Sequence, residues 1–184
     1  MAIPKELKEA ILMMPQKEKD KLLLRLVGKD ELLSEQLRVQ LLCNQNYILE
    51  ERQKVYEKIT RYVRKFTYNT AGWLLMDIRS LSGYINNHSK ITKDKHGEIV
   101  LQLHLMVSFI DKFRTNLQED ARNADTFAKD LVNRCYKYYT QILKLHEDFY
   151  IEFEAQMNTI LNFIHSYAAC KPFLEEKKLP KKFN

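Results

Sequence analysis

Glycine and proline are scarce in this chain, with four of each among 184 residues. A β-rich protein needs many turn residues, which glycine and proline commonly supply, whereas long helices need few. Apolar residues make up 45% of the chain and charged residues 29%, which is enough for both a core and a solvated surface. This composition predicts an all-α protein.

The three cysteines lack the spacing of a metal or redox site. Cys43, Cys135 and Cys170 are far apart in the chain, and no Cys-x-x-Cys pair exists, which excludes a zinc knuckle and a thioredoxin-type site. Widely spaced thiols of this kind are typical of reduced, intracellular proteins. We therefore expect a cytoplasmic protein.

Long apolar runs are missing as well. The apolar run near the N-terminus, residues 11–14, has charged residues on both sides. It is too short for the core of a signal peptide, and no later run approaches the length of a membrane span. We expect no membrane partner.

The motifs of common enzyme classes are also absent. The chain has no Gly-rich phosphate loop, no Gly-x-Ser-x-Gly and no dinucleotide-binding fingerprint. Helical di-iron proteins need Glu-x-x-His, which occurs nowhere in the sequence. We therefore predict no catalytic residue, no cofactor and no metal site, and we interpret the chain as non-enzymatic.

Residues 1–43 carry the punctuation of three short helices. Pro15 ends the first helix, because proline lacks the amide that a helix interior needs. Gly28 can end a second, leucine-rich helix, and Asp30 can cap the third. Because the second helix is apolar nearly all round, we expect this N-terminal segment to pack on the rest of the protein.

The apolar periodicity becomes long from residue 44 onward. One helical register holds over about 46–88, and it includes Tyr62, Trp73, Met76 and Tyr84, which are therefore expected in the core. Asn69 and Gly72 lie within this register and loosen a helix. We favour one kinked helix over two helices joined by a loop, and both remain open.

Two further registers follow a loop at about 88–97. A medium helix is predicted over 98–118, and a second very long helix, with two adjacent apolar rows, over about 121–168. We predict an elongated antiparallel helical bundle over 44–170 that combines these helices with 46–88. Residues 171–184 are interpreted as a basic, partly disordered tail.

Four cations on the first long helix form a candidate site for polyanions. Lys54, Lys58, Arg61 and Lys65 are separated by four, three and four residues, which aligns them on one side of a helix. Such a stripe can follow a phosphate backbone while interleaved tyrosines stack on bases. Nearby glutamates partly neutralise it, so a solvated face is the simpler interpretation and nucleic-acid binding the alternative function.

The wide apolar arc of the last helix gives the leading functional prediction. Tyr136, Tyr139 and Leu143 belong to its second row and are candidate protein-interface residues, because exposed apolar residues of this kind would form a protein-binding strip. We therefore predict a protein–protein interaction or structural module, able to form a homodimer along its long helices.

Overall fold

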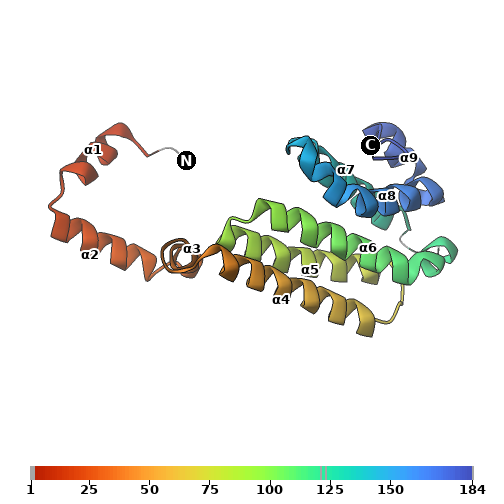
Figure 1. Cartoon of the computed structure of the whole chain (residues 1–184), viewed down its shortest axis with the longest axis horizontal. Helices are drawn as coiled ribbons and strands as arrows, with labels where there is room; N and C mark the ends of the chain where they lie inside the picture. Colours follow the sequence, from red (N-terminus) through yellow and green to blue (C-terminus); the bar gives the residue numbers. More distant parts are fainter. Residues whose placement is uncertain (1–2, 121, 123, 184) are drawn as a thin grey trace. The chain divides into compact units, whose positions relative to one another are not determined.

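The computed structural model describes residues 3–120, 122 and 124–183, and within these ranges the chain is helical, with no β-strand. The prediction of an all-α protein is confirmed. The chain divides into two compact units, Met1–Asn44 and Gln45–Asn184, which we call the N-terminal and the C-terminal unit (Figure 1). None of the described helices combines the length and the apolar character that crossing a membrane requires.

The N-terminal unit consists of the three short helices that its prolines and glycine predict: α1 (Lys5–Met13), α2 (Gln16–Val27) and α3 (Glu31–Leu42). Pro15 precedes α2, and the Asp30 carboxylate caps α3 by accepting a hydrogen bond from the Leu33 amide at 3.0 Å. Among the described residues of this unit only Val39 is buried. The leucines of α2 are therefore not covered by the helices of their own unit.

Residues 46–88 form two helices, so the favoured single kinked helix is wrong. The first, α4 (Gln45–Lys65), and the second, α5 (Ala71–Thr92), are separated by residues 66–70. Lys112 fixes the end of α4, because its ammonium group donates to three carbonyls of that end, those of Val63, Arg64 and Phe66, at 2.6–2.8 Å. The Thr70 hydroxyl then caps α5 by accepting from the Trp73 amide at 3.3 Å.

The connection between α4 and α5 also changes which face of α5 is buried. Trp73, Met76 and Tyr84 share the apolar register of α4 when the helix is continued without a break, yet all three are exposed. The buried face of α5 carries Leu74, Ile78 and other residues offset from them. A non-helical connection resets the angular phase, so a register carried across it selects the wrong face.

The medium helix is α6 (Lys95–Glu119), which is longer than the predicted 98–118. It begins directly after Asp94, whose side chain accepts from the Gly97 amide at 2.8 Å. In the structure α6 packs against α4, α5 and α8 (Figure 1). For this reason α6 is buried on several sides. Its side chains lie between α4 and α5 on one hand and α8 on the other.

The predicted long helix over 121–168 is also divided. The structure has α7 (Ala124–Ile142), a short 3₁₀ turn (Glu147–Phe149) and α8 (Tyr150–Ser166). Positions 121 and 123 of the predicted helix lie outside the described residues. The chain folds back so that α8 packs against α7. The Tyr150 hydroxyl donates to the Leu143 carbonyl at 3.1 Å, next to the end of α7. Folding back buries much of the apolar surface of α7 and α8 within the same chain, while Tyr136 and Leu143 of the second apolar row stay exposed.

The basic tail differs from the expected disordered segment. Residues Ala168–Cys170 form a 3₁₀ turn, α9 (Lys171–Lys177) follows, and the remaining chain packs down through Phe183, which is buried. Asn158 holds this end from both sides, because its Oδ1 accepts from the Phe183 amide at 2.7 Å and its Nδ2 donates to the Phe183 carbonyl. Apolar residues in the tail, such as Leu179, therefore add to the core.

Candidate functional site

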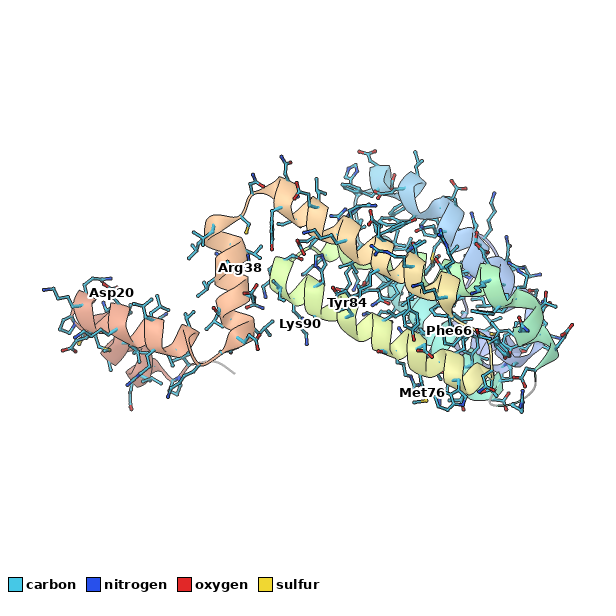
Figure 2. All side chains as sticks on the ribbon, turned by 90° about the horizontal axis from the view of Figure 1, so that it is seen from below. Asp20, Arg38, Phe66, Met76, Tyr84 and Lys90 are labelled. Atoms are coloured by element: carbon cyan, nitrogen blue, oxygen red, sulfur yellow. The ribbon has the colours of Figure 1, made fainter. Side chains whose placement is uncertain are left out.

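The four cations of the predicted stripe lie together in an open groove of about 420 Å³. Besides Lys54, Lys58, Arg61 and Lys65 from α4, the groove is lined by Tyr62 and Tyr84. We call these six residues the basic-aromatic groove. The tyrosine from α5 joins it because α5 returns alongside α4, and Figure 2 labels Tyr84 and Met76 on the exposed side of α5.

Two of the four cations in the groove contact carboxylates of their own helix. The Lys54 ammonium lies 2.6 Å from Glu51, and Arg61 lies 3.5 Å from Glu57. The hydrogen bond to Glu51 raises the pKa of Lys54. These glutamates offset two of the four positive charges, so the groove has a weaker positive potential than its four cations alone would give.

The aromatic rings of the groove are fixed by polar contacts. The Lys58 ammonium lies 3.6 Å from the centre of the Tyr84 ring, a cation–π contact. The Tyr62 hydroxyl donates to the Asp77 carboxylate, and this hydrogen bond raises the pKa of Tyr62. On α5, Trp73 and Met76 are 56% and 60% exposed. The outer side of α4 and α5 therefore combines cations, carboxylates and large apolar side chains.

The predicted strip of Tyr136, Tyr139 and Leu143 lies at the C-terminal half of α7 and partly serves internal packing. Tyr139 is half-buried, and its ring centre lies 5.8 Å from that of Phe183 in an edge-on contact. Tyr136 and Leu143 remain exposed, with Lys177 of α9 positioned 5.7 Å above the Tyr136 ring. The tail of the chain is thus one partner of this strip.

A second exposed surface, missed in the sequence, begins at Leu143. We call residues 143–154 the acidic-apolar segment, because they carry four carboxylates against one lysine, a net charge of −3. Leu143, Phe149 and Ile151 are exposed within it, and Ile151 is 81% accessible. A hydrogen bond of 2.9 Å between His96 and Glu152 ties the segment to the start of α6. The prediction of one continuous helix over about 121–168 hid this surface, because it left no break between α7 and α8.

A polar pocket of about 380 Å³ between α5, α6 and α7 was also missed. Arg79, Arg134 and Asp130 line it together with the buried polar side chains of Ser82 and Gln102. These residues lie up to 55 positions apart, and each is an ordinary helix residue in its local context. No local pattern could have brought them together.

Burial disfavours the charged forms of three titratable side chains in or beside the core, those of His104, Cys135 and Cys170. Burial lowers the pKa of His104 to about 4, and its ring stacks on Tyr56 with 3.6 Å between the ring centres. Burial also raises the pKa of the Cys135 and Cys170 thiols to about 12. At neutral pH this histidine is uncharged and both thiols are protonated, which makes them weak nucleophiles.

Across the ranges 3–120 and 124–183, no three of the His, Cys, Asp and Glu side chains are placed to hold a metal ion together. In comparisons with known proteins, the chain matches no family model, no curated protein and no solved structure.

Proposed function

We propose that this protein is a non-enzymatic helical protein–protein interaction module that self-associates, with the basic-aromatic groove of one copy binding the acidic-apolar segment of another. The observation that carries the proposal is the presence, within one compact unit, of two exposed surfaces with opposite charge and matching apolar character. The groove supplies positive charge and the segment supplies negative charge, and both expose apolar side chains.

Charge complementarity supports this pairing. The groove presents four cations, of which Lys58 and Lys65 have no carboxylate contact among the described residues. The segment presents four carboxylates. Contacts between such surfaces steer association and fix its orientation, and they weaken as salt screens the charges.

The apolar side chains give the contact its buried area. Tyrosine, tryptophan, methionine and arginine are the residue types enriched at interfaces, and the groove side exposes Tyr62, Tyr84, Trp73 and Met76. The segment exposes Phe149 and Ile151 to cover them. Arg61 adds a planar guanidinium that can pair with a carboxylate through two hydrogen bonds.

The positions of the two surfaces favour a head-to-tail arrangement. The central helix α6 packs against both α4 and α8, and these two helices lie on different sides of it in Figure 1. The groove and the segment of one copy are therefore presented in different directions. A contact between unlike surfaces produces rings or open chains rather than a two-fold dimer.

Nucleic-acid binding by the groove is the alternative function, and the local charge balance makes it weaker. Affinity for nucleic acid depends on the phosphates that the cations neutralise. Glu51, Glu57 and Asp77 contact groove residues directly, and each of them would repel a phosphate. A protein partner can satisfy both signs of charge, whereas a polyanion cannot.

Sedimentation velocity of the full chain tests self-association. At about 50 mM salt we expect the mass to rise above the chain mass of 22.0 kDa with concentration, and at about 500 mM salt to return to it. The groove variant carries Lys58→Glu with Arg61→Glu, and the segment variant carries Glu147→Lys with Asp148→Lys. Each variant alone should be monomeric.

An equal mixture of the two variants should associate again, because each reversed surface then faces a complementary one. A matched control, Lys181→Glu with Lys182→Glu, makes the same charge change as the groove variant but on exposed residues of the tail. It should associate as wild type does. A monomer at every concentration and salt, or no recovery in the mixture, would contradict the proposal.

The same samples distinguish the alternative. A monomeric chain that binds a single-stranded oligonucleotide at low salt, and loses this binding when Lys54, Lys58, Arg61 and Lys65 are replaced by glutamine, would establish nucleic-acid binding instead. Under the proposal, the oligonucleotide is bound no more tightly by wild type than by this variant.

A further inference from the structure

The pocket between α5, α6 and α7 is built differently from the surface groove. Its volume of about 380 Å³ falls in the range of small-molecule sites. Most of the residues that line it are polar or charged, and they come from three helices that are distant in the sequence. It shares no residue with the basic-aromatic groove, so its role is independent of the function proposed above.

The floor of the pocket consists of buried polar side chains with fixed positions. Gln102 is only 1% exposed, and its Oε1 accepts a hydrogen bond from the Ser82 hydroxyl at 3.0 Å. Its Nε2 donates to the Asn86 side chain at 3.2 Å. Burying a glutamine is unfavourable unless its amide is hydrogen-bonded, and here these bonds hold the polar groups in a defined arrangement.

The walls of the pocket carry an excess of positive charge. Arg79, Arg134 and Lys137 face a single lining carboxylate, Asp130, and Lys137 also lies 3.4 Å from Glu98, which is not part of the lining. Asp130 accepts from Arg79 at 3.0 Å and also from Arg134, and it thereby holds the two guanidinium groups at the pocket. A guanidinium has five N–H donors, so both arginines keep donors for a ligand after these contacts.

Gly83 keeps the pocket open. It lies inside α5, where glycine destabilises a helix relative to alanine. Its φ is negative, and a Cβ built at this position meets no atom within 4 Å. Neither the backbone nor the packing therefore requires glycine. The missing side chain leaves space at the lining of the pocket.

From these features we propose that the pocket binds a small anion, a carboxylate or a phosphate monoester, through the guanidinium groups of Arg79 and Arg134. Arginine forks match the geometry of both anions, which they bind through paired hydrogen bonds. The amide groups of Asn86 and Asn133 at the lining select a ligand that also carries hydroxyl or amide groups.

Two-dimensional amide NMR of the full chain tests this site. Inorganic phosphate and acetate are titrated separately at constant ionic strength, so that general screening does not change. We expect saturable shifts at the amides of residues 79–86 and 130–137 with at least one of the two anions. Saturation by phosphate alone assigns a phosphate ligand, and saturation by acetate alone assigns a carboxylate. No saturable shift up to about 100 mM of either anion would overturn the proposal.

Two variants make the result specific to the pocket. Gly83→Gln places a good helix former in the open space, so the chain should fold at least as well while the anion binds at least tenfold more weakly. Arg79→Gln removes an exposed donor and should weaken binding similarly. Lys65→Gln removes a cation from the groove and should have no effect. Equal binding by wild type and both pocket variants would contradict the proposal.

Discussion

In the C-terminal unit, apolar side chains from α4 through the tail form one continuous core, whereas the three helices of the N-terminal unit bury a single described residue, Val39. Both regions are helical and rich in leucine. The difference is that α4–α8 have neighbours on their apolar faces, while α1–α3 are short and contact one another little. Helix formation and burial are therefore separate properties. Most of the stability of a folded unit comes from the burial of apolar side chains.

Amide hydrogen exchange should show the largest difference between the two units. Amides in the middle of α6 open only by global unfolding and should exchange at least about 10³-fold more slowly than in an unfolded chain. Amides of α2 should be protected less than about tenfold, because isolated helices of 12 residues are marginal in water. Mass spectrometry or NMR after transfer to D₂O measures both.

Strong protection of the α2 amides would contradict this difference between the two units. It would show that another surface covers the leucines of the N-terminal unit in solution. Repeating the measurement after dilution would then identify a second copy as that surface if the protection falls.

Truncation of single apolar side chains tests the difference in burial between the two units. Phe153→Ala removes a fully buried ring and should lower the free energy of unfolding by about 3–5 kcal/mol. Leu24→Ala removes a side chain that is 72% exposed and should change it by less than about 0.5 kcal/mol. Urea unfolding followed by the single tryptophan, Trp73, reports on the C-terminal unit. Equal losses in the two variants would contradict the assignment of separate roles.

The pH dependence of stability tests burial in the C-terminal unit through His104. Burial lowers its pKa to about 4 in the folded protein, while an unfolded histidine titrates near 6.5. Between these values the unfolded chain binds more protons, so stability is full above pH 6.5 and falls as the pH drops toward 4. We expect His104 to contribute about 2 kcal/mol of this loss after allowing for solvent screening.

Urea unfolding of wild type and His104→Gln at pH 7 and pH 4 measures that contribution. The glutamine variant should lose about 2 kcal/mol less between the two pH values. His146→Gln, which replaces an exposed histidine, should keep the wild-type difference. If His104→Gln loses as much stability as wild type between pH 7 and pH 4, His104 is not desolvated in the folded protein.

The smallest expected effect concerns the end of α4. Lys112→Met removes the ammonium group that bonds three carbonyls of residues 63–66 and should cost about 1 kcal/mol of stability, since these bonds are partly exposed. Thermal or urea unfolding measures it. Lys65→Met removes a nearby lysine that makes no ion pair with the described residues and should be nearly neutral. A neutral Lys112→Met would show that α4 ends there for local reasons alone.

Much of the fold was predictable because its causes are local. The low content of glycine and proline and the helical apolar period predicted an all-α chain, and Pro15 and Gly28 marked the three N-terminal helices. The breaks at 66–70 and 143–149 contain neither residue. Asn69 and Gly72 lie near the first break and loosen a helix, but the continuous apolar register outweighed them in the prediction.

The candidate sites also include one part with local causes and another that depends on contacts between distant helices. The alignment of Lys54, Lys58, Arg61 and Lys65 follows from their spacing on one helix, so the sequence identified them correctly as neighbours on α4. Tyr84 joins them only because α5 returns alongside α4. The polar pocket depends on three helices meeting, and none of its residues was predicted as a site residue.

The sequence alone thus determined the helical class, the punctuation of the N-terminal helices and the stripe of cations on α4, since each depends on backbone geometry within a few residues. Tertiary structure decided where α4 and α7 end, which face of α5 is buried and which charges meet in the pocket. These features depend on contacts between helices distant in the chain, such as Lys112 at the end of α4 and Arg134 against Ser82. A one-dimensional period carries no information about the partner that each face will meet.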